Sequence, residues 1–165
     1  MHQVRPDPVR PGQESVWDYP RPARAELTAS QIPIRLGRVV IADTWRAVRT
    51  LETSHPPSYY IPPADVVAGS LVPAAGSSFC EWKGQARYFD VVADDERRPR
   101  AAWSYPAPTA PFAILRDHVL FYAGAMEACF VDGELVVPQA AGFYGGWMTP
   151  TIAGPFKGGA GSQFW

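Results

Sequence analysis

The sequence predicts a mainly β fold in which two small antiparallel sheets pack face to face, with long Pro- and Gly-rich loops and little helix. Three properties of the 165-residue chain favour this fold: proline (18) and glycine (14) are abundant, only 19% of the residues are charged, and 13% are aromatic. Short strands joined by many turns fit this composition better than a helical bundle does.

Short apolar runs predict the first strands. Residues 32–43 read as two strands around a turn at Gly37, because apolar side chains alternate on both sides of that glycine, and residues 47–53 predict a third strand. Two proline pairs make residues 54–63 a stiff, extended loop, since proline cannot lie in a central strand. The next residues, 63–66, are typical of a single helical turn.

The second half of the chain predicts further strands. Residues 85–94 predict a strand, residues 94–100 its turn, and residues 100–106 the partner strand of the hairpin. Strands are also predicted at 118–124 and 127–137, and the pair Asp132-Gly133 within the second is a hairpin-turn signal.

We expect one β domain at residues 14–165, because a chain of this length suits a single domain with a real core. Residues 1–13 are polar and Pro-rich, which indicates a flexible N-terminal arm. The glycine-rich tail from Phe143 carries aromatic residues that a disordered tail usually lacks, so we expect it to dock them on the body.

Charge and hydropathy exclude several classes of partner. The net charge is −1 and no basic block stands out, so nucleic acid is not expected. No apolar run reaches the length of a membrane span and the N-terminus lacks the apolar core of a secretory signal, which favours a cytoplasmic protein without a membrane partner. With two cysteines and no C-x-x-C, a disulfide framework and a four-cysteine zinc site are not expected, and we predict no metal and no other cofactor.

The first candidate for chemistry is the segment LETSHPPSYYIPPADV, which begins at Leu51. His55 is followed by two prolines, which push its backbone to the extended region and fix the direction of the imidazole. Glu52 lies three residues earlier and can orient one ring nitrogen. The pattern indicates general acid/base catalysis or a polar anchor for a ligand; the alternative is a loop histidine bonded to its neighbours for structure.

The second candidate is the run FCEWKGQARYF at residues 79–89. If this run is extended, Cys80 and Trp82 face one side while Lys83 faces the other. A thiol near a cation or an imidazole can act as a nucleophile, whereas a buried free cysteine is more often a small hydrophobic side chain. Cys129 lies among apolar residues, so we interpret it as part of the core.

Aromatic residues predict the walls of a pocket for a small molecule with a flat ring. The candidates for ligand binding are Tyr60, Trp82, Trp103 and Tyr105, together with Lys83 for an anionic group. The alternative is that these rings pack in the core and on strand faces.

The segments LETSHPPSYYIPPADV and FCEWKGQARYF, together with SVWDYPRPAR, AAWSYPAP and FYGGWMTPTIAGPFKG, closely resemble the family called domain of unknown function 427. The resemblance covers residues 14–165. The resemblance implies a fold like the Mss4 β complex, in which two sheets form a tent, and it places six residues in one motif: Glu52, His55, Tyr60, Cys80, Trp82 and Lys83. Some Mss4-like relatives bind zinc through paired C-x-x-C knuckles, which this chain lacks. A nucleotidyltransferase label has been attached to the family, but the sequence shows no paired-Asp metal motif after a Gly-Ser turn.

The leading hypothesis is therefore a small soluble domain with a small-molecule pocket built from Glu52, His55 and Cys80. In a catalytic version Cys80 is a nucleophile or His55 an acid/base, while Tyr60 or Lys83 holds an anionic group. One alternative is a non-catalytic module that binds a protein partner or forms a homodimer, and a second is the nucleotidyltransferase-like activity. The sequence leaves open whether the protein is an enzyme, and with which substrate and oligomeric state.

Overall fold

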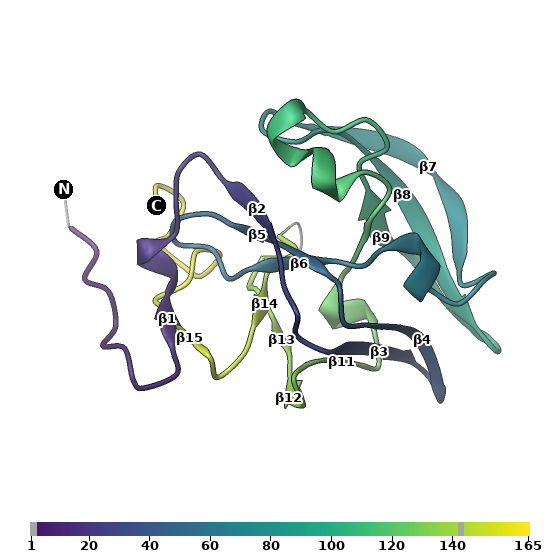
Figure 1. Cartoon of the computed structure of the whole chain (residues 1–165), viewed down its shortest axis with the longest axis horizontal. Helices are drawn as coiled ribbons and strands as arrows, with labels where there is room; N and C mark the ends of the chain where they lie inside the picture. Colours follow the sequence, from purple (N-terminus) through teal and green to yellow (C-terminus); the bar gives the residue numbers. More distant parts are fainter. Residues whose placement is uncertain (1–2, 142–143) are drawn as a thin grey trace.

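Antiparallel strands dominate this computed structural model, which describes residues 3–141 and 144–165 (Figure 1). Residues 1–2 of the expected N-terminal arm and Phe143 of the expected tail lie outside the described residues. The strands are β1 (Glu14–Ser15), β2 (Arg24–Leu27), β3 (Ile32–Leu36), β4 (Val39–Thr44), β5 (Val48–Leu51), β6 (Ser58–Tyr60), β7 (Leu71–Cys80), β8 (Gly84–Ala93), β9 (Glu96–Ser104), β10 (Val119–Phe121), β11 (Ala128–Val131), β12 (Glu134–Leu135), β13 (Val137–Pro138), β14 (Trp147–Met148) and β15 (Ile152–Ala153). Short 3-10 helices are η1 (Val16–Asp18), η2 (Pro63–Asp65), η3 (Ala110–Leu115) and η4 (Ala123–Ala125).

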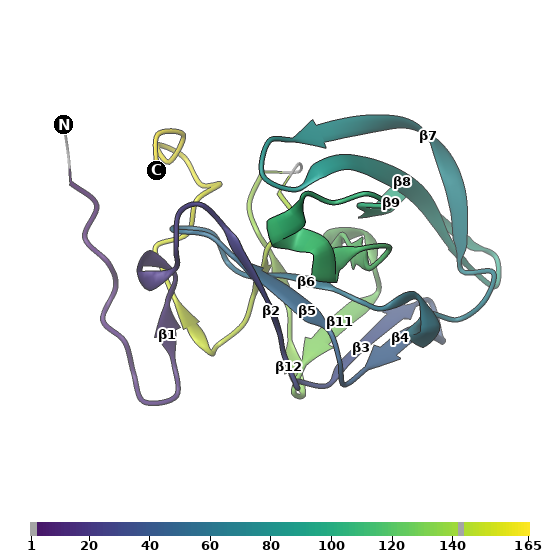
Figure 2. The ribbon, with the colours of Figure 1, turned by 45° about the horizontal axis from the view of Figure 1, so that its top comes forward.

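Two four-stranded sheets enclose the main core. Their strand orders are β10-β9-β8-β7 and β12-β11-β3-β4, and Figure 2 shows the first sheet arching over the second. Ile34 and Ile41 from one sheet and Ala102 and Phe121 from the other are fully or almost fully buried in the same cluster. The mainly β prediction is confirmed, because the alternating apolar residues of β3 point inward as a half-buried strand requires.

The remaining strands form smaller sheets. The structure therefore has more sheets than the two that were predicted. β2, β5 and β6 make a three-stranded sheet, β13 pairs with β14, and β1 pairs in parallel with β15. A bridge between Ile61 and Val119 joins the end of β6 to the edge strand β10. The three-stranded sheet is therefore joined to the β10 edge of the β10-β9-β8-β7 sheet. The candidate site described below lies where these two sheets meet.

Several local predictions are confirmed. β3 and β4 turn at Gly37, which has a φ of 59°, and η2 begins at Pro63. The β11–β12 hairpin turns at Asp132-Gly133, whose φ values of 49° and 82° suit a turn of this type. The stiff loop between the proline pairs is not wholly irregular, because Ser58–Tyr60 forms β6 and pairs with β5.

Two predictions for the long hairpins were wrong. β7 was missed because Pro73, Gly76 and two serines interrupt Leu71–Cys80 and no apolar alternation runs through it. It is an edge strand with a register shift between Pro73 and Ser77. The predicted turn at 94–100 is shorter, because β9 already begins at Glu96. Pro99 is tolerated there because the β8–β9 register shifts opposite it.

The tail contributes aromatic residues to the body. Trp147 is 1% exposed and its ring N–H donates to the carbonyl of Phe121 at 3.1 Å. The rings of Trp165 and Trp17 meet edge to face with 5.4 Å between their centroids. Phe164 was also expected to dock on the body, but it does not, since 92% of it is exposed.

The N-terminal segment also touches the body, through a backbone hydrogen bond of 2.8 Å from Asp7 to Gly154. None of the helical segments in the described part of the chain has the length and apolar character needed to cross a membrane.

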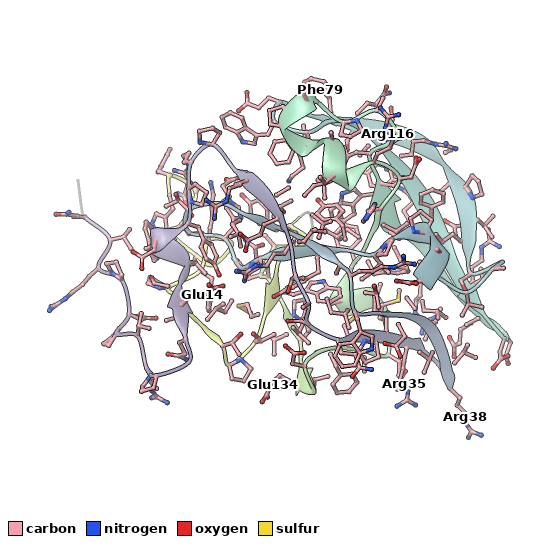
Figure 3. All side chains as sticks on the ribbon, in the orientation of Figure 1. Glu14, Arg35, Arg38, Phe79, Arg116 and Glu134 are labelled. Atoms are coloured by element: carbon pink, nitrogen blue, oxygen red, sulfur yellow. The ribbon has the colours of Figure 1, made fainter. Side chains whose placement is uncertain are left out.

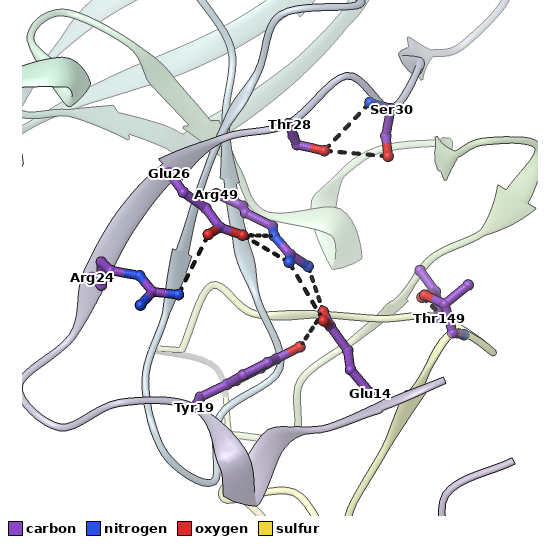
Figure 4. A network of polar contacts seen from close by, with 9 residues as sticks. Glu14, Tyr19, Arg24, Glu26, Thr28, Ser30, Arg49 and Thr149 are labelled. Atoms are coloured by element: carbon purple, nitrogen blue, oxygen red, sulfur yellow. Dashed lines mark hydrogen bonds and ion pairs between the residues drawn. The ribbon is translucent and has the colours of Figure 1, made fainter. Parts of the chain in front are cut away.

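Arg49 is the centre of a polar network that joins β1 to the three-stranded sheet (Figure 4). Its guanidinium donates to Glu26 at 2.8 Å and to Glu14 at 2.5 Å, and the hydroxyl of Tyr19 also donates to Glu14, at 2.8 Å. Burial alone would raise the pKa of Glu14, but the hydrogen bonds from Arg49 and Tyr19 outweigh it and hold that pKa below its ordinary value. The network therefore contains two carboxylates bound to one arginine.

Replacing this arginine should loosen the attachment of β1. We expect Arg49→Met to lower the free energy of unfolding by about 2 kcal/mol, because it leaves two partly buried carboxylates without their cation. Arg24→Met is the matched control and should cost less than about 0.5 kcal/mol, since Arg24 is exposed. Urea denaturation of both variants measures the difference, and equal effects would contradict this role of Arg49.

Candidate functional site

A cavity of about 470 Å³ lies where the three-stranded sheet, the β7–β8–β9 sheet and the C-terminal segments meet. Most of the predicted site residues line it. They are Glu52, His55, Tyr60, Cys80, Lys83, Trp103 and Tyr105. Figure 3 shows Phe79, which also lines the cavity, at the outer end of the β7–β8 hairpin beside η3.

Trp82 is the predicted ligand-binding residue that does not line this cavity. Its side chain packs, half-buried, against the cluster that contains Trp103 and Tyr105. The extended arrangement that would align Trp82 with Cys80 does not occur, because β7 ends at Cys80 and residues 81–83 form the turn into β8. This turn is fixed by Thr109, whose hydroxyl donates to the Trp82 carbonyl at 2.6 Å and whose N–H donates to the Lys83 carbonyl at 3.0 Å.

Glu52 and His55 form the polar centre of the cavity. The loop folds back on itself, since the His55 N–H donates to the Glu52 carbonyl at 3.0 Å. This turn places His55 Nε2 at 3.2 Å from Glu52 Oε2. Only 16% of the His55 side chain and 26% of the Glu52 side chain are exposed, so the pair is partly shielded from water.

Gln139 fixes the proton on His55. The amide oxygen of Gln139 accepts from the Gly146 N–H at 3.2 Å, which leaves the amide nitrogen to donate to the Lys157 carbonyl at 2.8 Å and to His55 Nδ1 at 3.0 Å. A ring nitrogen that accepts carries no proton, so the network assigns the neutral His55 tautomer with its proton on Nε2. That proton then points at Glu52.

The hydrogen bond from Gln139 to His55 and the one from His55 to Glu52 lead to a single carboxylate. Burial by itself would raise the pKa of Glu52, but the hydrogen bond from His55 and the positive charges of Lys83 and Arg21 outweigh it. The pKa of Glu52 therefore lies below its ordinary value, and the group is a carboxylate at neutral pH. His55 holds this carboxylate through Nε2, while its Nδ1 accepts from Gln139, so Glu52 is the acceptor offered to a bound molecule.

Lys83 brings a positive charge to the same cavity. Its ammonium nitrogen lies 6.0 Å from the ring centroids of Tyr105 and Phe112. In the described part of the chain no carboxylate forms an ion pair with it. A half-buried cation without an anionic partner suits an anionic group of a ligand.

The two cysteines lie in different environments. Cys80 is half-buried at the end of β7 and lines the cavity. No hydrogen bond joins its thiol to His55, whose two ring nitrogens are bonded to Glu52 and Gln139. Cys129 is 2% exposed in the main core, and burial raises the pKa of its thiol to about 12, so it is an inert core residue as expected.

Tyrosines form the inner wall of the cavity. Tyr60 and Tyr105 are buried, with 6.2 Å between their ring centroids. Burial raises the pKa of both hydroxyl groups well above the ordinary value, so both are neutral phenols at physiological pH. Trp103, also buried, completes this wall. The wall is thus aromatic and uncharged. Lys157 also lines the cavity, but its ammonium group donates to the main-chain oxygen of Trp165 at 2.9 Å. Glu52 and Lys83 are therefore the charged groups left to contact a ligand.

Sequence reasoning missed several lining residues. They are Ala23, Thr50, Pro56, Ser58, Phe79, Gln139, Tyr144, Gly145 and Lys157. Gln139 and Lys157 follow a hairpin and a glycine-rich stretch, and nothing local marks them as partners of His55. Within residues 3–141 and 144–165, no three His, Cys, Asp or Glu side chains gather in a way that could hold a metal ion.

The geometry defines a small β domain with a charged, aromatic-lined cavity between its sheets. A comparison with protein-family models matches residues 24–132 to the domain of unknown function family DUF427, which is more than half of the chain, so the chain belongs to this family. The matched residues include Glu52, His55 and Lys83 but end before Gln139. No curated protein matched the chain. The family expected from the sequence is confirmed, and the relation to the Mss4-like fold stays a prediction.

The tautomer of His55 can be tested directly. In the wild type, ¹⁵N NMR of the histidine rings should show His55 with its proton on Nε2 and His118 with its proton on Nδ1, because His118 Nδ1 lies 2.9 Å from the Arg116 carbonyl and must donate to it. Gln139→Met should remove the preference at His55, leave His118 unchanged and lower the free energy of unfolding by about 2 kcal/mol. A His55 ring with its proton on Nδ1 in the wild type would contradict the assignment.

Ser54, which precedes His55, is strained. It has a φ of 74°, and its buried hydroxyl has no hydrogen-bond partner among the residues that the structure describes. Ser54→Gly should raise the free energy of unfolding by roughly 1 kcal/mol, because glycine adopts this φ readily and removes the unpaired group. Ser58→Gly, in β6, should instead destabilise the protein by about 0.5–1 kcal/mol. Thermal and urea unfolding would distinguish the two, and a destabilising Ser54→Gly would refute the strain.

Proposed function

We propose that this domain binds a small amphoteric molecule in the cavity between its sheets. The molecule would carry a hydrogen-bond donor or cationic group for Glu52, an anionic group for Lys83 and a flat apolar part. The observation that carries the proposal is that one cavity holds a charged carboxylate and an ammonium group without an ion-pair partner, against a wall of neutral aromatic rings. A volume of about 470 Å³ lies within the range of small-molecule sites.

The flat part of the ligand is inferred from the wall. Tyr60, Trp103 and Tyr105 are rigidly packed and present ring faces and edges to the cavity. Such surfaces favour an aromatic or other planar group over a flexible chain. Phe79 is 77% exposed at the rim, where it would cover part of a bound molecule.

Within this proposal Glu52 is the group that would accept a hydrogen bond from a bound donor, because its lowered pKa keeps it ionised. His55 is a positioning residue, because both ring nitrogens are occupied and its role is to hold the carboxylate in place. Cys80 lines the cavity without a base bonded to its thiol, so the Cys80–His55 version of the catalytic hypothesis has less support than a role of Glu52 as a carboxylate that binds the ligand.

A set of matched probes tests the proposal. L-tryptophan carries both charges, tryptamine lacks the carboxylate and indole-3-propionate lacks the ammonium. We expect L-tryptophan to bind at least about tenfold more tightly than either analogue, measured by isothermal titration calorimetry, because each charge gains a charge-assisted contact.

Two variants assign the contacts. Lys83→Met should reduce binding of L-tryptophan to the level of tryptamine, and Glu52→Gln should reduce it to the level of indole-3-propionate. Arg98→Met, on β9 outside the cavity, is the control and should change neither. Equal affinity of the wild type and Lys83→Met for L-tryptophan would refute the proposal.

The two alternatives give different results in the same experiments. Binding of a nucleoside triphosphate with Mg²⁺, in place of the indole probes, would favour the nucleotidyltransferase-like activity. Concentration-dependent dimers in sedimentation, with no response to any probe, would favour the interaction or dimerisation module.

A further inference from the structure

A second cavity of about 570 Å³ lies beside the first, across the segment that contains Gln139, Tyr144 and Gly145. We propose that it is a separate ligand site, which takes a planar aromatic ring bearing a carboxylate or phosphate group. The ring would lie among Tyr88, Tyr122 and the small residues that face them, and the anionic group would bind Arg100.

Arg100 is held in position before any ligand binds. Its guanidinium carbon lies 4.3 Å from the centroid of the Tyr88 ring, and Nη1 donates to the Ala75 carbonyl at 2.9 Å. Gly76 makes room for this arrangement, because a Cβ at that position would lie 2.7 Å from Nη1. The stacking and the hydrogen bond leave the other guanidinium N–H groups for a second partner, and a planar fork suits two oxygens of one anion.

The charges around this cavity favour an anion. Among the described residues that line this cavity, only Arg100 has a charged side chain. No carboxylate in the described ranges forms an ion pair with its guanidinium. Asp90 is the acid that contacts the Arg100 backbone, at 2.9 Å, and its carboxylate is already bound to Arg97 at 2.7 Å.

The walls favour a flat ring. Tyr122 is half-buried and packs on Trp103 with 4.5 Å between the ring centroids, which holds its face in place. Burial and the neighbouring Tyr88 raise the pKa of the Tyr122 hydroxyl, so it is a neutral phenol that can donate a hydrogen bond. Ala123 and Gly124 line the same cavity and add little side-chain volume, which leaves room for a ring beside the tyrosines.

The second site is independent of the first. The two cavities share Gln139, Tyr144 and Gly145, but Glu52 and Lys83 line only the first cavity and Arg100 only the second. Variants can therefore remove either site without touching the charged groups of the other, so failure of one proposal does not imply failure of the other.

Three probes of one shape test the chemistry: 2-naphthoate, 2-naphthyl phosphate and the neutral 2-naphthamide. Calorimetry on the wild type should show at least about tenfold tighter binding of an anion than of the amide. The stronger of the two anions identifies a carboxylate or a phosphate ligand. Titration in ¹⁵N NMR should shift the Arg100 Nε–H signal, a readout that needs no variant.

Variants then locate the binding. Arg100→Met should reduce anion binding at least about tenfold and leave the amide unchanged, and Arg100→Lys should fall between. Arg98→Met, outside the cavity, should match the wild type. Gly124→Leu should block all three probes by filling the cavity. Its backbone permits a side chain, since a Cβ there would meet Pro138 at 3.7 Å, an ordinary contact.

Three results would overturn the proposal. They are equal affinity of the wild type for both anions and for 2-naphthamide, unchanged anion binding in folded Arg100→Met, and loss of binding in Lys83→Met instead of Arg100→Met. The third result would assign the probes to the first cavity.

Discussion

The buried amide of Gln139 is the constraint on which the candidate site depends. Its three hydrogen bonds reach His55, 84 residues away in the chain, and also Gly146 and the Lys157 carbonyl, 7 and 18 residues away. Because the Gly146 N–H occupies the amide oxygen, the nitrogen must donate to His55, and His55 must donate to Glu52. A buried amide with every polar group satisfied specifies one arrangement, since rotating it would leave several groups unpaired.

Glycines that allow close approach separate the two cavities. A Cβ on Gly145 would lie 2.5 Å from the Trp103 ring, and a Cβ on Gly146 would lie 2.4 Å from Gln139 Oε1. The backbone at these two residues therefore passes between packed side chains where no larger residue fits. It divides one aromatic region into a compartment with charges of both signs and a compartment with Arg100 alone.

Local features of the site followed from the sequence because they depend on short spacing. Glu52 and His55 are three residues apart on a loop stiffened by prolines, so their contact could be predicted from the chain alone. Trp82 was placed wrongly because alternation applies to a strand, and β7 ends at Cys80. β7 itself was missed because its composition is that of a loop, while its pairing with β8 is what makes it a strand.

The sequence by itself determined a mainly β chain of short strands, the family, the Asp132-Gly133 turn and the Glu52–His55 pair, since each depends on composition, motif or neighbouring residues. The tertiary structure alone decided that Gln139, 84 residues from His55, sets the histidine tautomer. It also decided that Lys83 has no ion-pair partner within residues 3–141 and 144–165, and that Arg100 lies over Tyr88 beside a second cavity. These contacts arise between segments that meet only when the sheets pack, and no periodicity along the chain encodes them.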